Sequence, residues 1–335
     1  MEHAWGITLP LDGVPLPAHR GIVERLDELG YTDVWSSEAS GTDAFTPLAL
    51  TAAWTATLRL GTAIAPVYTR GPGLLAMSAA ALAEAAPGRF ILGVGASTPI
   101  IVERWNATPF GEPYRRTRDT VRFLKRALTG ERVDERFETF TVRGFRLARV
   151  PEVPPPILVA ALRSGMLRLG VREADGVITN CLASTDVPKV VAELGPDGAG
   201  KEVVARIFVC PTDDSAYARR AARRLLSTYL TVPVYAEFHR WLGRGELLED
   251  MWQAWAAGDR KSANEAIPDE VVDELVVHGP PEQCRAHVQR YVDSGITTPV
   301  IALLATTDGA APGEAAAAAR LAAERVLEGL APPAR

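Results

Sequence analysis

Six small residues line the ends of two apolar runs in the chain: Gly61, Ala63, Ala65, Gly93, Gly95 and Ala96. Backbone without bulky side chains lets a flat ring system approach closely, with amide groups free to bond its heteroatoms. This composition therefore favours a planar cofactor. The same glycines could instead ease strand packing or turns, and spacing alone leaves both interpretations open.

Other catalytic signatures are absent from the sequence. There is no HExxH, GxSxG or P-loop, and Gly93–Thr98 departs from the dinucleotide fingerprint because its last position is threonine. The five histidines lack metal-ligand spacing, so we expect no metal site. Among them, His239 is the candidate for catalysis, because it lies in the aromatic insertion. The cysteines are odd in number and lack CxxC spacing, which predicts reduced, buried thiols at Cys181, Cys210 and Cys284.

Strand and helix patterns alternate along the whole chain. Eight strand candidates recur, at Ala4–Leu9, Thr32–Ser36, Leu58–Val67, Phe90–Gly95, Pro156–Ala161, Gly176–Asn180, Val203–Cys210 and Thr298–Ala305. Continuous apolar runs are typical of strands covered on both faces, and helix patterns lie between them. This predicts an α/β fold, a (β/α)8 barrel of the TIM type, as a single domain over residues 1–335. Ligands would bind at the carboxyl ends of its strands.

Two segments do not fit this regular alternation of strands and helices. Glu131–Val150 alternates apolar and polar residues around Arg143-Gly144, which predicts an antiparallel hairpin (131–150) inserted before the fifth strand. Ala216–Gly295 is too long for one crossover and predicts a helical insertion (216–295) between the seventh and eighth strands. Its Trp and Tyr residues could form an apolar lid or simply attach the insertion to the barrel. The run Ala315–Ala319 is expected in a terminal helix.

Composition limits the function further. The 335 residues are 47% hydrophobic with a formal net charge of −5, which is ample for a core and disfavours general polyanion binding. We expect no nucleic-acid partner. The start MEHAWGITLPLDG goes straight into a strand, and no run is long enough to span a bilayer, so we expect no membrane contact and a cytoplasmic protein.

Six motifs together resemble the luciferase-like monooxygenase superfamily, and most closely its branch that uses the deazaflavin coenzyme F420. They are YTDVWSSE (31–38), LGTAIAPVYTR (60–70), RFILGVGAS (89–97), PPILVAAL (155–162), ADGVITN (174–180) and GPPEQCRAHVQRYVDSGITTP (279–299). The resemblance covers nearly the whole chain in order. Each motif alone is weak evidence for this family, whereas the six motifs in this order are specific to it.

This resemblance implies a deazaflavin, or FMN, ring at the carboxyl ends of the barrel strands. It further implies a non-prolyl cis peptide at Ala63-Ile64, and a cofactor phosphate at the helix start after the fifth strand, where Ser164 could alternatively be only an N-cap. The residues that the resemblance assigns to the cofactor are Ala63, Ile64, Ala65, Gly93, Gly95, Ala96, Ser97, Ala161, Leu162, Arg163, Ser164, Gly165 and Asn180.

The expected acid/base pair is incomplete. Relatives that oxidise alcohols commonly have a histidine after the acidic residue of the second strand and a glutamate after the fourth strand, whereas this chain has Glu38-Ala39-Ser40 and Ala96-Ser97. Hydride transfer to a C=C, C=N or C=O acceptor needs a weaker proton donor than alcohol oxidation, so a reductase is favoured. Glu38 and Ser37 are the catalytic candidates, although Glu38 could be a structural carboxylate. The alternatives are an FMN-dependent two-component monooxygenase and a non-catalytic flavin-binding protein.

The expected partners follow from the same reasoning. The aromatic insertion suggests a small substrate, apolar or aromatic. Four arginines lie near predicted strand-end loops and could meet the acidic tail of a deazaflavin: Arg70, Arg104, Arg115 and Arg116. Relatives often dimerise, and the apolar helix Phe45–Ala56 suits a homodimer interface, although the same stripe is expected of a helix packed on its own barrel.

Overall fold

A closed barrel of eight parallel strands organises the computed structural model, which describes residues 4–304 and 323–333. The strands are β1 (Gly6–Thr8), β2 (Asp33–Ser36), β3 (Arg59–Thr62) continued by β4 (Ala65–Pro66), β5 (Phe90–Gly95), β8 (Ile157–Ala160), β9 (Gly176–Asn180), β10 (Glu202–Pro211) and β12 (Thr298–Leu303). Parallel pairing of β1 with both β2 and β12, and of β10 with both β9 and β12, closes the ring. The TIM-type barrel predicted from the sequence is confirmed.

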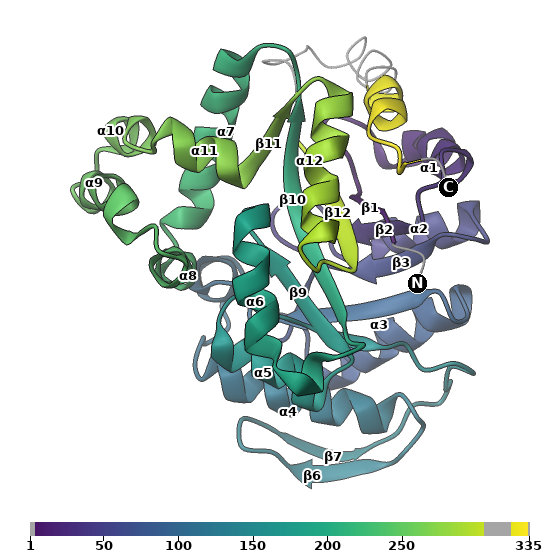
Figure 1. Cartoon of the computed structure of the whole chain (residues 1–335). Coiled ribbons are helices and arrows are strands. Elements are labelled where there is room, and N and C mark those ends of the chain that lie inside the picture. The colour runs from purple at the N-terminus through teal and green to yellow at the C-terminus, as the bar shows by residue number, and fades with distance from the viewer. Residues whose placement is uncertain (1–3, 305–322, 334–335) are drawn as a thin grey trace.

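Helices surround this barrel (Figure 1). They are α1 (His19–Glu28), α2 (Thr46–Trp54), α3 (Pro72–Ala85), α4 (Pro113–Ala127), α5 (Ser164–Glu173), α6 (Val187–Leu194) and α12 (Pro281–Asp293). Gly30 and Gly130 follow α1 and α4 with φ values of 84° and 83°, which suits glycine because it has no Cβ to clash. Short one-turn helices and a six-residue π-helix, Ile100–Trp105, complete the connections between the larger elements.

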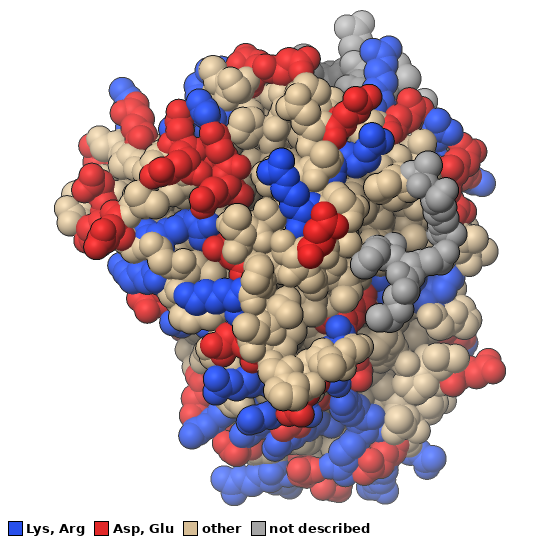
Figure 2. All heavy atoms as spheres, in the orientation of Figure 1, with Lys and Arg blue, Asp and Glu red and all other residues tan. Residues whose placement is uncertain are grey.

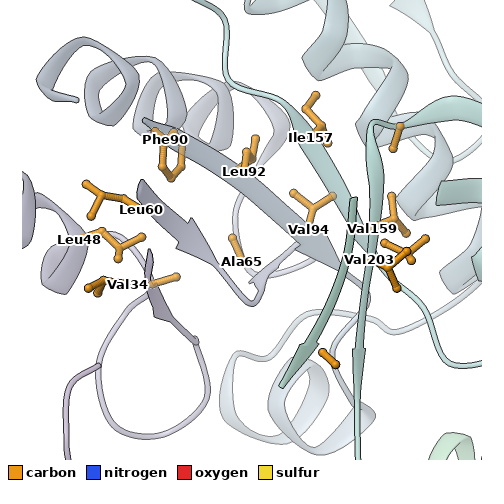
Figure 3. Packing of buried hydrophobic residues seen from close by; sticks show 14 of the residues in the cluster. Val34, Leu48, Leu60, Ala65, Phe90, Leu92, Val94, Ile157, Val159 and Val203 are labelled. Carbon is orange, nitrogen blue, oxygen red and sulfur yellow. The ribbon is translucent and has the colours of Figure 1, made fainter. Parts of the chain in front are cut away.

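The main hydrophobic core lies between the outer face of the barrel and the helices. Val34, Leu60, Leu92 and Val159 come from successive strands and belong to this layer, and Leu48 of α2 lies beside Val34 and Leu60 (Figure 3). These side chains are fully buried. Each contributes about 1.5–3 kcal/mol by leaving water. Burial on both faces explains why the strands read as continuous apolar runs.

The predicted hairpin is present, but its turn differs from the sequence-based expectation. β6 (Val133–Arg136) and β7 (Thr141–Phe145) pair antiparallel, and the turn between them spans 137–140 rather than Arg143-Gly144. Phe137 and Phe140 of this turn pack edge-on against Phe123 of α4. Packing of these rings on α4 accounts for the turn position, because it buries aromatic residues that a turn at Gly144 would place within a strand.

The helical insertion follows β10 and contains one element that the sequence analysis missed. It comprises α7 (Ser215–Leu230), α8 (Pro233–Leu242), α9 (Gly245–Ala256), α10 (Arg260–Glu265) and α11 (Asp269–Leu275), which lie to one side of the barrel (Figure 1). β11 (Val276–Gly279) then pairs in parallel with the carboxyl half of β10, beyond the part that pairs with β9. α7 to α11 and β11 share a second core around Phe208, Leu226 and Val276.

The last described segment packs against the start of the barrel. Residues 323–329 are helical. Tyr31 donates a hydrogen bond from its hydroxyl to the Leu327 carbonyl at 3.0 Å, and Trp5 Nε1 donates to the Leu330 carbonyl at 3.0 Å. The predicted helical run Ala315–Ala319 lies outside the described residues.

On the face drawn in Figure 2, basic and acidic side chains are interspersed over the lower part of the molecule, and acidic side chains gather over the helical insertion at the upper left. Within the described residues, no helix combines the length and apolar character needed to cross a membrane.

Candidate active site at the carboxyl ends of the barrel strands

The barrel interior is closed by an apolar layer centred on Trp35. Its members are Trp35, Ile91, Leu158, Ile178, Val204 and Val300, with Ala63 and Ile64 packed against it. Side chains alternate along a strand, so residues two positions further on also face the interior, nearer the carboxyl ends of the strands. Those residues form the barrel mouth.

The glycines of the sequence motifs are packed against protein atoms. A Cβ at Gly61 would lie 2.2 Å from Trp35 Cε3, and one at Gly93 would lie 1.9 Å from the Thr62 carbonyl oxygen. The amide and carbonyl of Gly93 also bond the Thr62 hydroxyl, at 2.9 and 2.8 Å. A Cβ at Gly95 would lie 2.7 Å from that of Ala160. The geometry favours the packing interpretation at these positions, and a cofactor role for Gly93 and Gly95 stays a prediction.

The third barrel strand is interrupted where the resemblance implies. The Ala63-Ile64 peptide bond is cis and separates β3 from β4. Ala63 and Ile64 are half-buried at the barrel mouth, whereas Ala65 is fully buried in the outer core and pairs with Val94. Ala65 therefore belongs to the main core, and its cofactor role stays a prediction.

The end of β5 leads directly into this region. Ala96 packs against the outer core while remaining half-buried. Ser97 has a φ of 64° in the left-handed region, unusual for a residue with a side chain, and it is half-buried.

The start of α5 offers an anion-binding arrangement. Arg163 is the N-cap residue and Ser164 is the first helical residue, so the N-cap interpretation of Ser164 is wrong. A Cβ at Gly165 would meet nothing within 4 Å. The first amides of a helix lack partners within the helix and carry its positive dipole end. Arg163 is 44% exposed and lies 3.6 Å from a Glu237 oxygen of α8.

Two further predicted residues precede that helix. Ala161 is buried, and its amide bonds the Ile178 carbonyl at 2.8 Å. Leu162 is half-buried against the main core. They connect β8 to α5.

Glu38, the principal catalytic candidate, accepts hydrogen bonds from three residues. Arg70 Nη2 lies 2.8 Å from Oε2, the Ala44 amide donates to Oε2 at 3.1 Å, and the Thr69 hydroxyl donates to Oε1 at 3.3 Å. Groups of the chain itself occupy both oxygens of this carboxylate, which favours the structural interpretation. Ser37 is half-buried beside it, and its hydroxyl makes no hydrogen bond within the described residues.

A polar cluster that the sequence analysis did not assemble occupies the mouth beneath the insertion. Asn180 Nδ2 donates to the Tyr235 hydroxyl at 3.0 Å, and Arg206 Nη1 donates to the Tyr229 hydroxyl at 3.0 Å. Asn180 Oδ1 and Arg206 Nε are buried and have no partner among the described residues. Arg206 could have been found from its sequence, because a lone charge interrupts the otherwise apolar strand VVARIFVC.

His239 and the three cysteines do not provide acid/base chemistry. Burial, together with the nearby Arg244 charge, lowers the pKa of His239 to about 3, so its imidazole is neutral at physiological pH. All three cysteines are free and buried, as predicted. Burial raises the pKa of Cys181 to about 12 and that of Cys210 to about 11, which keeps these thiols protonated.

The four arginines proposed to meet an acidic cofactor tail differ in availability. Arg70 pairs with Glu38 and Asp43, and Arg115 pairs with Glu112. Arg116 lies over the Phe140 ring and makes hydrogen bonds to backbone carbonyls. Arg104 is exposed on the π-helix. Arg104 makes no ion pair within the described residues, and contact of any of these arginines with such a tail stays a prediction.

Comparisons with known proteins agree with this geometry. A family model for luciferase-like monooxygenases matches residues 6–298. A candidate coenzyme F420-dependent oxidoreductase of Mycobacterium tuberculosis is 27% identical, over 89% of this chain and 92% of that protein.

Two solved structures share the fold. The coenzyme F420-dependent tetrahydromethanopterin reductase of Methanopyrus kandleri has a TM-score of 0.75 at 19% identity, covering 99% of both chains. The oxygenating constituent of 3,6-diketocamphane monooxygenase from Pseudomonas putida, in complex with FMN, has a TM-score of 0.63 at 16% identity, covering 99% of this chain and 97% of that one. Homologues thus use F420, and the family also includes FMN users. The chain belongs to the luciferase-like monooxygenase family and is an oxidoreductase.

Proposed function

We propose that this protein is an F420-dependent oxidoreductase that transfers hydride between deazaflavin C5 and a small organic substrate, acting as a reductase of a C=C, C=N or C=O bond. The observation that carries the proposal is the open N-terminus of α5 at the barrel mouth, where Arg163, Ser164 and Gly165 can hold a cofactor phosphate. The F420-dependent relative supports the choice of cofactor.

The residues present fit such a cofactor. Ala63 and Ile64 offer a half-buried apolar surface, and the unpartnered Asn180 Oδ1 offers an acceptor for a ring N–H. When bound, a deazaflavin supplies a two-electron hydride carrier that reacts poorly with oxygen. Trp35 and the rest of the apolar layer exclude water from the barrel below the site.

In this proposal Glu38 is a positioning residue that connects two loops of the site. It joins the loop after β2 to the segment after β4 through Arg70. The hydroxyl of Ser37 beside it makes no hydrogen bond to any residue that the structure describes. A reductase fits this arrangement because protonation of a reduced acceptor demands less of a side chain than proton abstraction from an alcohol.

Fluorescence titration of the purified protein with oxidised F420, and separately with FMN, tests the proposal. We expect saturable binding of F420, weakened about tenfold in Ser164→Ala and in Arg163→Gln, because each loses a hydrogen bond to an anion. Arg168→Gln is the matched control, since Arg168 lies on α5 but pairs with Glu193 away from the helix start. Failure to bind F420 would contradict the proposal.

A two-component monooxygenase using FMN is the second candidate, favoured by the fold shared with the FMN-bound Pseudomonas putida structure. Preference for FMN in the titration, with oxygen consumption on mixing with reduced FMN, would support it. Saturable F420 binding without turnover on any acceptor would instead support a non-catalytic flavin-binding protein.

Assembly and location complete the proposal. We propose a cytoplasmic homodimer that uses the outer face of α2, where Ala49 and Ala53 are exposed and Leu50 is half-buried. Its mass in solution, measured by light scattering, tests the dimer, and a monomer at micromolar concentration would contradict it.

A further inference from the structure

Arg206 is a cation placed inside the barrel mouth. It lies two residues after Val204, which belongs to the inner apolar layer, and therefore faces the interior. Its Cα partner on β9 is Asn180, which follows the interior residue Ile178 in the same way. The two polar side chains thus stand side by side at the carboxyl ends of neighbouring strands.

The guanidinium of Arg206 lacks a counter-ion within the described residues. Three other partly buried or buried arginines pair with carboxylates: Arg59 with Asp33 and Glu202, Arg70 with Glu38, and Arg244 with Asp186. Two more, Arg89 and Arg116, donate to backbone carbonyls instead. Among the described residues, the hydrogen-bond partner of Arg206 is the Tyr229 hydroxyl, which accepts from Nη1. Its Nε is buried without a partner in this part of the chain, and its Nη2 makes no hydrogen bond there. Removing a charge from water is costly unless a partner compensates it.

Aromatic rings hold this guanidinium in place. Its Cζ lies 5.0 Å from the centroid of the Phe208 ring, and the Tyr229 ring packs against both Phe208 and Tyr235. Burial raises the pKa of Tyr235, so its phenol stays neutral and does not balance the charge. The helical insertion thus orients the cation without neutralising it.

We propose that the substrate of this enzyme carries a carboxylate, and that the Nε–Nη2 edge of Arg206 binds it. This inference rests on the proposed function for placing a substrate at the mouth. Two parallel N–H donors match the two oxygens of a carboxylate, which is the geometry that distinguishes arginine from lysine. The neighbouring rings indicate an aryl or similarly apolar body next to the acid.

Calorimetric titration with paired probes tests this inference. The probes are benzoate, phenylacetate and cinnamate, each compared with its neutral amide. We expect the wild-type protein to bind at least one carboxylate at least tenfold more tightly than its amide, and Arg206→Gln to lose that preference. Arg220→Gln is the matched control, because it removes the same charge from an exposed position on α7.

Arg206→Lys separates charge from geometry and also serves if Arg206→Gln does not fold. It keeps the charge without the paired donors, so we expect an intermediate preference. If Arg206→Lys bound the carboxylate as tightly as the wild type, the claim that paired N–H donors bind it would be wrong. Absence of carboxylate preference in the wild type, or its retention in Arg206→Gln, would overturn the proposal.

F420 titration of the same variants distinguishes this inference from the proposed function. If the wild type binds no F420, the proposed function fails whatever the carboxylates do. We expect Arg206→Gln to bind F420 within about twofold of the wild type. A loss of F420 affinity as large as the loss of carboxylate affinity would assign Arg206 to the cofactor ring and overturn the proposal.

Discussion

Arg70 Nη2 lies 2.8 Å from Glu38 Oε2, and the Nε of the same guanidinium lies 3.1 Å from that oxygen. The two side chains are 17% and 16% exposed. This pair joins the end of β2 to the segment before α3. Arg70 also contacts Asp43 at 3.4 Å and lies over the Phe45 ring, so it organises the whole loop between β2 and α2.

Replacing Glu38 by Gln should destabilise the protein by about 1–2 kcal/mol, because Arg70 loses a charged partner at a partly exposed site. Urea unfolding measures this change. The matched control is Glu24→Gln, whose partner Arg20 is exposed, and it should change stability by no more than about 0.5 kcal/mol. Equal effects of the two substitutions would contradict a special role for the Glu38 pair.

The effect of Glu38→Gln on turnover separates positioning from proton transfer. A positioning residue lowers the rate by a similar factor at every pH, whereas an essential acid or base removes one limb of the pH–rate profile. We expect the first result, because Arg70, the Ala44 amide and Thr69 already occupy both oxygens of Glu38.

Replacing Gly61 by Ala should destabilise the fold by about 1–3 kcal/mol, since the added Cβ would lie 2.2 Å from the Trp35 ring within the closed barrel. Gly71→Ala is the control, because a Cβ there meets nothing within 4 Å and the φ of −59° suits any residue. Thermal unfolding of both variants checks the prediction. If Gly61→Ala were as stable as Gly71→Ala, the interior packing around Trp35 would be looser than described.

Arg244 secures the insertion through a buried ion pair. Its Nη1 lies 2.9 Å from Asp186 Oδ2, and its Nη2 lies 2.6 Å from Glu274 Oε2. Burial raises the pKa of the Asp186 carboxyl, and the Arg244 charge works against that rise. Arg244→Met should therefore cost about 3–5 kcal/mol, because it leaves Asp186 buried without a cation.

A second substitution checks the origin of that loss. Asp186→Leu combined with Arg244→Met should recover part of the stability, since the double variant leaves no unpaired charge of this pair. Chemical unfolding of the single and double variants measures the recovery. Strict additivity of the two substitutions would show that the ion pair is not the cause.

His239 should make stability depend on pH. Its pKa is lowered from 6.5 to about 3 in the folded protein, so below pH 6.5 the unfolded chain binds a proton that the folded chain does not. Stability is then fully present above pH 6.5 and falls toward pH 3. Between pH 7.5 and 5 this residue should account for a loss of about 2 kcal/mol.

His239→Gln tests that dependence. The variant should lose less stability than the wild type between pH 7.5 and 5, as measured by urea unfolding at each pH. Parallel losses in the two proteins would mean that His239 titrates normally in the folded state.

The residues of the candidate site came from the sequence to different degrees. Short contiguous motifs predicted two features of the site. They are the interruption of the third strand at Ala63-Ile64 and the helix start near Ser164. The packing of Gly61 beneath Trp35 did not, because that contact joins different strands. Nor did β11, a four-residue strand that exists only because β10 extends beyond β9 and offers a free edge.

The alternation of buried strands and helices, several helix ends at glycine, and the family of the chain can all be predicted from local sequence patterns. These depend on periodicity, on backbone preference and on short motifs, which are local properties. The tertiary structure alone decided which distant side chains meet: Glu38 with Arg70, Asn180 beside Arg206, and Tyr229 and Tyr235 over both. Barrel closure sets those pairings through strand register and packing, and neither is encoded within any one segment of the chain.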